Sequence, residues 1–389
     1  MIANALKGIR VVDLSRILAG PWCTQNLADL GAEVIKIEKP GAGDDTRAWG
    51  PPYLEGPDGQ TMSAYFMCCN RGKRSVCLDF KSDTGRAQLL NLIRDADVLV
   101  ENYRAGTLKR YQLDYDSLKA INPRLVYASI TGYGQTGPKA QRPGYDYIFQ
   151  GLGGLMSYTG HADGSPGAGP LRTGVAVVDI STGMYATSAI LAALFQRQQT
   201  GQGVWLDLAL LDVAVAMNAN QAANYLVSGK NPERSGNAHP NLAPYEVFRA
   251  ADGYFILAIG NDSQFGKFCV FSGHPALAED PRYATNSARI QNLASLRAEL
   301  GRIIAEHPRK YWTDALDELG ISWGAINTLE DVFNDEQVRH RGMLNTVHHP
   351  VMGEMRLVGN PMLAASRTLA ATAAPPLLGE HTRMLEDLA

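Results

Sequence analysis

Neither sign of charge is in large excess in this sequence of 389 residues. The 36 lysines and arginines are balanced by 39 aspartates and glutamates, which leaves a formal net charge of −3. A chain that binds nucleic acid through its phosphates normally carries a clear basic excess. We therefore expect no nucleic-acid partner.

Paired cysteines and long apolar runs are also lacking. The five cysteines are odd in number and form no C-x-x-C motif, which favours reduced thiols in the cytoplasm. The N-terminal stretch has neither the apolar segment nor the cleavage pattern of a signal peptide. No apolar run approaches the ~20 residues that a membrane-spanning helix needs. The sequence thus predicts a cytoplasmic protein with no membrane partner.

Several catalytic and cofactor motifs are absent. The eight histidines form no H-E-x-x-H and no Cys/His pair at ligand spacing, so no metal site is predicted. There is no G-x-S-x-G nucleophile elbow. Glycines 132, 134 and 137 match G-x-G-x-x-G, but the following "PKAQRPG" is a poor helix start, and the first strand–helix turn, "LSRILAGPW", lacks these glycines. A nicotinamide dinucleotide site is therefore disfavoured.

The first 210 residues alternate strand and helix patterns. Apolar runs typical of strands lie at 9–14, 33–38, 97–102, 124–130 and 204–210. Helical spacing is found at 21–31, 84–96, 115–121 and 184–198. Strands that alternate with helices of this length predict a parallel, doubly wound, Rossmann-like α/β sheet.

The pattern changes in the second half of the chain. A helix over 212–229 precedes a polar loop, two alternating strands and helical stretches at 262–272 and 295–319. This order predicts a smaller α+β domain. We place the large domain at 1–215, the small domain at 216–330, and a C-terminal segment that returns to the large domain at 331–389.

Asp179 is a single carboxylate in a segment that is otherwise small or apolar. It lies between a strand-like run at 175–178 and the helical run at 184–198. Aspartate before an apolar periodic run is a common N-cap, because its side chain accepts hydrogen bonds from the unpaired N–H groups of the first turn. The local pattern therefore favours helix capping over chemistry.

Cations cluster where predicted strands end, at positions where an open α/β sheet binds ligands. They could surround an anion with several phosphates, or they could be solvated surface charges; composition favours neither. The residues are Lys39, Lys73, Arg74, Lys81, Arg104 and Arg110.

Seven ordered blocks, which run nearly end to end, resemble the class III CoA-transferase family, the formyl-CoA and carnitine CoA-transferase group. The blocks are "DLSRILAGPWCTQNLADLGAEVIKIEKPGAGDDTR", "NRGKRSV", "VENYRAGTLKR", "SITGYGQTGPKAQRPGYDY", "GVAVVDISTGMYA", "AHPNLAPYEVF" and "PPLLGEHT". In that family the aspartate of the G-x-x-x-x-D-x-x-[ST]-G block is the nucleophile. The resemblance therefore assigns Asp179 to catalysis.

The chemistry that this implies needs neither ATP nor a metal. A carboxylate with a pKa near ~4 is ionised at pH 7 without a base. It attacks an acyl-CoA thioester to give a mixed anhydride, and the CoA thiolate then returns to give an aspartyl-CoA thioester. An incoming acid repeats these steps in reverse. The CoA thioester is a co-substrate, no tightly bound cofactor is expected, and the site must exclude water.

The resemblance also places CoA and the second subunit. Leu18 and Ala19 would lie along its adenine and ribose. The other implied contacts are Asn102 and Tyr103 in the nucleotide pocket, Lys39, Lys81, Arg104 and Arg110 near the phosphates, and Tyr145 and Asp146 at the pantetheine end. Family members form interlocked homodimers, with the active site between the large domain of one chain and the small domain of the other.

Two departures from the sequence patterns of the family disfavour some of its activities for this chain. The family's 2-methylacyl-CoA racemases use a histidine where this chain has Tyr145, and tyrosine is a poor base with its pKa near ~10. The glycine-run loop of formyl-CoA transferases is missing, and "AIGNDSQFGKF" (258–268) stands in its place. Racemase activity and formyl or oxalate specificity are therefore disfavoured.

Within the family, the segments "GAGDDTRAWGPP", "SITGYGQTGP" and "GNAHPNLAPYEVF" resemble their counterparts in the branch that moves CoA from succinyl-CoA to glutarate. A dicarboxylate needs a cation for its far carboxylate, and Arg47 and Arg71 are the candidates. Either could instead pair with an acidic neighbour (Asp44 or Asp45) or with a CoA phosphate. His239 and Asn241 could face the substrate from the partner chain. Itaconate or mesaconate would suit the same argument as acceptors. The alternative function is that of a non-catalytic acyl-CoA sensor, although a sensor needs no nucleophile.

Overall fold

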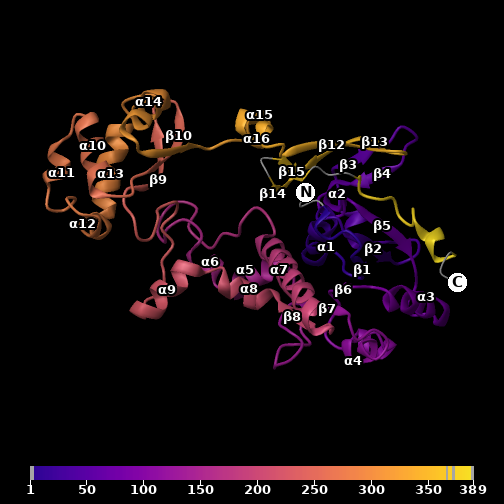
Figure 1. The fold of residues 1–389 in the computed structure, drawn as a ribbon. Helices are drawn as coiled ribbons and strands as arrows, with labels where there is room; N and C mark the ends of the chain where they lie inside the picture. Colours follow the sequence, from indigo (N-terminus) through magenta and orange to yellow (C-terminus); the bar gives the residue numbers. More distant parts are fainter. Residues whose placement is uncertain (1–3, 365–366, 370–372, 387–389) are drawn as a thin grey trace. The chain divides into compact units, whose positions relative to one another are not determined.

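The structure is a computed structural model that describes residues 4–364, 367–369 and 373–386. The chain divides into two compact units (Figure 1). The first unit comprises Met1–Leu155, Thr173–Asn218 and Phe333–Ala389, and the second comprises Met156–Arg172 and Ala219–Val332. The chain therefore leaves the first unit twice and returns to it twice.

A six-stranded parallel sheet forms the centre of the first unit. Its order is β5-β2-β1-β6-β7-β8, and every neighbouring pair is parallel. The strands are β1 (Arg10–Asp13), β2 (Glu33–Glu38), β5 (Lys73–Cys77), β6 (Val98–Glu101), β7 (Val126–Thr131) and β8 (Trp205–Ala209). The predicted parallel sheet is confirmed. Its strand order reverses between β1 and β6, where open α/β sheets form a ligand crevice.

Helices cover both faces of this sheet. On one face, Val11 packs with α1 (Ala19–Asp29) and α7 (Val177–Thr200). On the other face, Val12 packs with α3 (Asp83–Arg94), with α4 (Tyr115–Lys119) and with the 3-10 turns η3 (Leu108–Tyr111) and η4 (Thr382–Leu385). Adjacent valines on opposite faces reflect the two-residue period of a strand. The sheet is thus doubly wound, as predicted.

Helix α7 differs from its prediction. It begins at Val177, so the strand-like run predicted at 175–178 is wrong. The helix extends to Thr200, and its length and composition would suffice to cross a membrane. A core helix passes the same test, and α7 buries Ala186, Ile190 and Leu194 in the core of the first unit.

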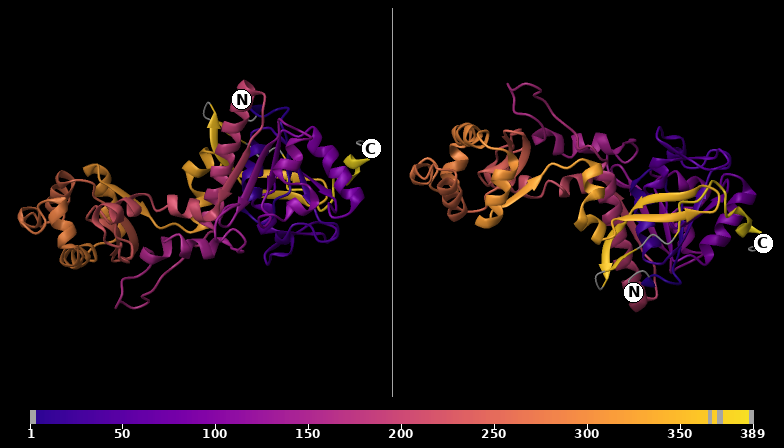
Figure 2. Two further views of the ribbon diagram at one scale, coloured as in Figure 1. Left: turned by 90° about the horizontal axis from the view of Figure 1, so that it is seen from below. Right: turned by 90° about the horizontal axis from the view of Figure 1, so that it is seen from above.

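Shorter elements complete the first unit. The C-terminal hairpin of β12 (Leu344–His349) and β13 (Gly353–Val358) packs on Met62 and Phe66 and lies over the N-terminal part of this unit (Figure 2). The remaining elements are η2 (Asp45–Ala48), β3 (Tyr53–Glu55), β4 (Thr61–Ser63), α2 (Ala64–Met67), α5 (Asp146–Leu152), α8 (Leu210–Ala216), α16 (Glu336–His340), β14 (Asn360–Ala364) and β15 (Arg367–Leu369). Helices α6 (Leu155–Tyr158) and α15 (Leu329–Asn334) lie where the chain passes between units.

The second unit is an antiparallel sheet with helices, of the predicted α+β type. Its strand order is β11 (Ser322–Ala325), β10 (Gly253–Ala258), β9 (Tyr245–Ala250). The helices are α9 (Ala219–Ser228), α10 (Asp262–Phe271), α11 (Ala276–Glu279), α12 (Asn286–Gln291), α13 (Leu293–Ile304) and α14 (Arg309–Leu319). Pro308 separates α13 from α14, because proline cannot continue a helix. The single helix predicted over 295–319 is therefore two.

Candidate active site

A cavity of about 490 Å³ opens at the carboxyl ends of β1, β6 and β7. This is the crevice on either side of the strand-order reversal, where open α/β sheets bind ligands. The strand ends supply much of its wall: Arg16, Ile17, Leu18 and Ala19 follow β1, Asn102, Tyr103, Arg104 and Ala105 follow β6, and Ile130, Thr131 and Gly132 lie at the end of β7.

Asp179 also lines this cavity, from the first turn of α7. It does not cap the helix: Ala176 occupies the N-cap position, and no side chain of the cap contributes a hydrogen bond. The capping carboxylate is Asp146, whose Oδ1 accepts hydrogen bonds from the N–H groups of Val178 (2.7 Å) and Asp179 (3.1 Å). The capping role that the local pattern favoured for Asp179 is therefore wrong, and its side chain is left for the cavity.

The electrostatic surroundings of Asp179 change its acidity. Burial, and then the negative charge of Asp146, raise the pKa of Asp179 to about 7. Within the described part of the chain, no hydrogen-bond donor offsets these two effects at its carboxylate. The expectation of an ordinary pKa near ~4 is therefore wrong. With this pKa, the side chain of Asp179 is protonated in a substantial fraction of the molecules at neutral pH.

Asp146 is held rigidly behind the nucleophile. Its side chain is buried, and its Oδ2 accepts a hydrogen bond of 2.6 Å from Gln150 Nε2. The other amide atom, Gln150 Oε1, accepts from the Thr173 N–H at 3.0 Å. Asp146 was predicted at the pantetheine end of CoA, but it is not among the residues that line the cavity. Its observed contacts make it the anchor for the start of α7.

Three arginines line the same cavity as Asp179: Arg16, Arg104 and Arg142. Arg16 forms an ion pair of 3.0 Å with Asp45, and both side chains are about half exposed. Only Arg104 was predicted. The position of Arg16 just past β1 is a signal that could have identified it, whereas no sequence signal marks Arg142.

Six of the ten predicted CoA contacts do lie together. Asp179 shares the cavity wall with Leu18, Ala19, Asn102, Tyr103, Arg104 and Tyr145. The other three cations, Lys39, Lys81 and Arg110, are exposed and do not line this cavity. Lys73, another of the cations that could have surrounded an anion, does not line the cavity either. It is buried within β5, where its Nζ lies 3.0 Å from Asp13 Oδ2.

The two arginines predicted to hold a dicarboxylate are engaged elsewhere. Arg47 makes a bidentate ion pair with Glu38 and lies over the ring of Phe66 at 3.7 Å. Its partner is thus neither Asp44 nor Asp45, the acidic neighbours considered from the sequence. Arg71 makes a bidentate pair with Asp29 and is buried. Neither arginine lines the cavity.

The predicted substrate contacts of the small domain lie in the second unit. His239 stacks on Tyr245, with 5.1 Å between ring centroids, and its Nδ1 accepts a hydrogen bond of 3.0 Å from the Asn241 N–H. The segment 258–268 is ordered as the end of β10 followed by α10, which is capped by Asn261 through the Gln264 N–H.

The model of CoA-transferase family III matches residues 6–382. The chain belongs to this family. It is 48% identical over 377 residues to a succinate–glutarate CoA-transferase of Agrobacterium fabrum, which covers 97% of this chain and 93% of that protein. It is 43% identical over 378 residues to the succinyl-CoA:glutarate CoA-transferase of Mus musculus, with coverage of 97% and 85%.

A solved structure agrees with this assignment. The crystal structure of a CAIB/BAIF family protein from Brucella suis matches with a TM-score of 0.87 and 47% sequence identity, and covers 100% of both chains. The predicted family is confirmed, and this family III CoA-transferase is an enzyme that uses a CoA thioester as co-substrate.

Proposed function

We propose that this CoA-transferase moves CoA from succinyl-CoA to a dicarboxylate such as glutarate, with Asp179 as the nucleophile. The observation that carries the proposal is the position of Asp179, in the first turn of α7 and in the wall of a cavity that three arginines also line. The two named relatives, both succinate–glutarate or succinyl-CoA:glutarate transferases, support this substrate class.

In the first half of the proposed reaction, the Asp179 carboxylate attacks the thioester carbonyl. A C–O bond forms, the C–S bond breaks, and CoA leaves as a thiolate. The thiolate then attacks the aspartyl carbonyl of the anhydride, which releases succinate and leaves an aspartyl-CoA thioester. The acceptor carboxylate reverses these two steps and leaves as its CoA ester. The high pKa of Asp179 favours attack, because a more basic carboxylate is a stronger nucleophile once ionised.

The far carboxylate of the acceptor requires a cation. We assign this role to Arg142, which lines the cavity and lies three residues before Tyr145 in the chain. Of the three arginines in the cavity wall, Arg16 is already paired with Asp45. Arg104 lies beside Asn102 and Tyr103 and suits the CoA phosphates. Arg47 and Arg71 would first have to leave Glu38 and Asp29, and breaking such buried pairs is costly.

Glutamine variants of Arg142, Arg71 and Arg47 distinguish these candidates. With glutarate as acceptor, we expect Arg142→Gln to raise KM about tenfold or more, and to have little effect on KM for a monocarboxylate acceptor. If Arg71→Gln shows this selectivity instead, the assignment to Arg142 is wrong and the candidate from the sequence is right.

We also propose that the protein is a cytoplasmic homodimer. In this dimer, His239 and Asn241 of one chain contact the substrate that is bound to the other chain. Large apolar side chains on α5 and α7 support the dimer, because Ile148, Leu152, Tyr185 and Phe195 are 47–65% exposed in the single chain. Exposed apolar side chains grouped on neighbouring helices are typical of a protein–protein interface.

The proposed chemistry is tested by trapping the covalent intermediate. The enzyme is incubated briefly with succinyl-CoA, treated with hydroxylamine and analysed by peptide mass spectrometry. We expect a hydroxamate at Asp179, none in Asp179→Ala, and glutaryl-CoA as product when glutarate is added. Epimerisation of a 2-methylacyl-CoA without labelling at Asp179 would indicate a racemase. Binding of acyl-CoA that Asp179→Ala leaves unchanged, with no turnover in the wild type, would indicate a sensor.

A further inference from the structure

The residue after Arg16 in the cavity wall has an unusual backbone. Ile17 has φ of 72°, in the left-handed region that β-branched residues rarely adopt. The other described non-glycine residues with positive φ are Gln112 and Ala219, and neither lines the cavity. Strained backbone of this kind persists only where the surrounding structure holds it in place.

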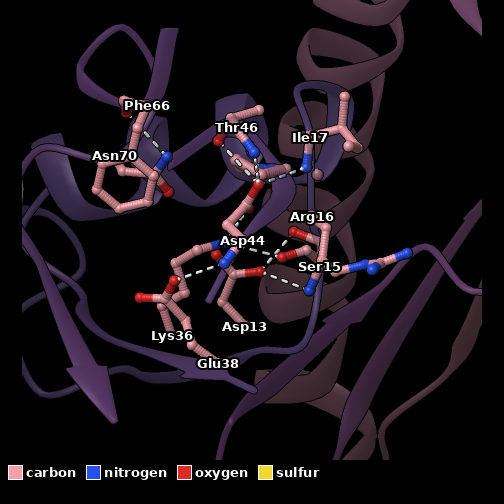
Figure 3. Close-up of polar contacts among 12 residues, drawn as sticks. Asp13, Ser15, Arg16, Ile17, Lys36, Glu38, Asp44, Thr46, Phe66 and Asn70 are labelled. Carbon is pink, nitrogen blue, oxygen red and sulfur yellow. Dashed lines mark hydrogen bonds and ion pairs between the residues drawn. The ribbon is translucent and has the colours of Figure 1, made fainter. Parts of the chain in front are cut away.

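Side chains hold every backbone polar group of residues 15–17. Figure 3 shows three of them, Asp13, Lys36 and Asp44, around this turn. The six contacts are Ser15 N–H to Asp13 (2.9 Å), Ser15 C=O from Lys36 (2.9 Å), Arg16 N–H to Asn102 (2.9 Å), Arg16 C=O from Asn102 (2.6 Å), Ile17 N–H to Asp44 (3.3 Å) and Ile17 C=O from the thiol of Cys69 (3.6 Å). Five of the six contacts thus come from residues at least 21 positions away in the chain, and the contact of Asp13 is local.

The central members of this cluster are charged and fully buried. Lys36 Nζ lies 2.9 Å from Asp44 Oδ2, and neither side chain is exposed to solvent. Asp44 also accepts hydrogen bonds from the N–H and hydroxyl of Thr46, and its own N–H donates to Glu38. A buried pair adds little net stability, but removing one partner is costly. A pair of this kind is therefore better suited to fixing local geometry than to adding stability.

This turn is packed closely against the helix that follows it. A Cβ atom on Gly20, in the first turn of α1, would lie 2.3 Å from Ser15 Cβ. A shift of the turn therefore moves Leu18 and Ala19 as well as Arg16, and all three residues line the cavity with Asp179.

We propose that Asp44 and Lys36 are positioning residues for the CoA-transfer reaction, which hold residues 15–18 in the left-handed turn at Ile17 and so fix this wall of the cavity. They act through the turn, since neither lines the cavity itself. The role in turnover rests on the proposed function, but the role in shaping the acyl-CoA site does not.

The test is a double-mutant cycle of Asp44→Ala with Ile17→Gly, because glycine adopts a left-handed backbone at little cost. In the wild-type background we expect Asp44→Ala to weaken succinyl-CoA binding and to lower kcat/KM, each about tenfold. In the Ile17→Gly background the same change should cost less than about threefold. Equal factors in both backgrounds, or lower thermal stability with unchanged binding and kcat/KM, would overturn the proposal.

Succinyl-CoA binding is measured by calorimetry on variants that also carry Asp179→Ala, so that no covalent step contributes to the heat. Failure of the proposed chemistry would therefore appear as missing aspartyl labelling in the wild type, while the binding cycle still reports on the turn. The two failures are distinguishable.

A second comparison applies if Asp44→Ala does not fold. Ile17→Gly should melt at a higher temperature than Ile17→Ala and should bind succinyl-CoA more tightly. The matched control is Gln112, which has φ of 55° and lies outside the cavity. Gln112→Gly should likewise melt higher than Gln112→Ala, with no difference in binding. If the two Ile17 variants do not differ in melting temperature or in binding, the proposal is wrong.

Discussion

Asp146 has two opposite effects on the nucleophile. Its carboxylate accepts the N–H groups of Val178 and Asp179 and so fixes the first turn of α7. The same negative charge raises the pKa of Asp179, together with the larger effect of burial. A neutral amide at this position could still accept hydrogen bonds from the helix but would not repel the neighbouring carboxylate. The two effects can therefore be separated by substitution.

The pH dependence of turnover reports on this arrangement. Because attack requires the ionised carboxylate, we expect kcat/KM to rise about tenfold per pH unit below about pH 7 and to level off above it. Asp146→Asn should move this acidic limb to lower pH. The measurement is kcat/KM for succinyl-CoA between pH 5 and 9, and Asp146→Ala serves as the variant that also loses the cap. An acidic limb at the same pH in Asp146→Asn would contradict the prediction.

The same pKa has a consequence for stability. Asp179 titrates near 3.8 when unfolded and near 7 when folded, so the folded state holds the proton more tightly. The contribution of Asp179 to stability therefore falls as the pH rises from about 4 through 7, and then stays level. Asparagine does not ionise, so the variant Asp179→Asn does not lose stability in this way as the pH rises. We expect it to be more stable than the wild type by ~1–2 kcal/mol at pH 8, after allowance for solvent screening, and about equal at pH 4.

Chemical unfolding at these two pH values measures this difference. The control is Asp45→Asn, at an exposed carboxylate of the same cavity. A stability gain of Asp179→Asn that is the same at both pH values would show that the carboxylate is not destabilised by its surroundings.

At the scale of elements, the crossing of α1 and α7 positions the nucleophile. A Cβ atom on Gly183 of α7 would lie 2.7 Å from the backbone oxygen of Ala19 at the start of α1. Glycine is required here because the two backbones approach too closely for a side chain. Asp179 lies one helical turn before Gly183, so the crossing sets its distance from the residues that follow β1.

Substitution of this glycine tests the crossing. We expect Gly183→Ala to destabilise the protein by about 1–3 kcal/mol, because the helices must separate, and to lower kcat/KM by displacing Asp179. The matched control is Gly301→Ala in α13, where an added Cβ meets no atom within 4 Å. That change should stabilise the protein by up to about 1 kcal/mol through helix propensity. Equal effects at the two glycines would refute the argument.

At the scale of the whole molecule, we expect assembly to cover the exposed apolar side chains of α5 and α7. Light scattering should give a mass near twice the 42.1 kDa of one chain. Phe195 is 65% exposed on α7, and Phe195→Glu should shift the enzyme toward monomer with loss of activity. Val270→Glu, at a side chain with 68% exposure on α10, is the control and should leave the mass unchanged. A monomeric wild type with full activity would contradict the proposed dimer.

The sequence by itself determined the features that depend on local pattern. The run at 33–38 predicted β2 with the bounds that the structure has, because a short run rich in β-branched residues favours a strand locally. The ordered blocks identified the family, and the block around Asp179 identified the candidate nucleophile. Each strand run and each block consists of residues that are close together in the chain, and the family follows from the order of the blocks along it.

The tertiary structure alone decided which partners the polar groups have. Helix α7 starts earlier than its own pattern indicates, because its cap is Asp146, 33 residues before Asp179. Arg47 and Arg71 are engaged by Glu38 and Asp29, and the left-handed turn at Ile17 is held by side chains from other segments. Ion pairs, pKa shifts and strained turns depend on which segments meet in space, and periodicity along the chain carries no such information.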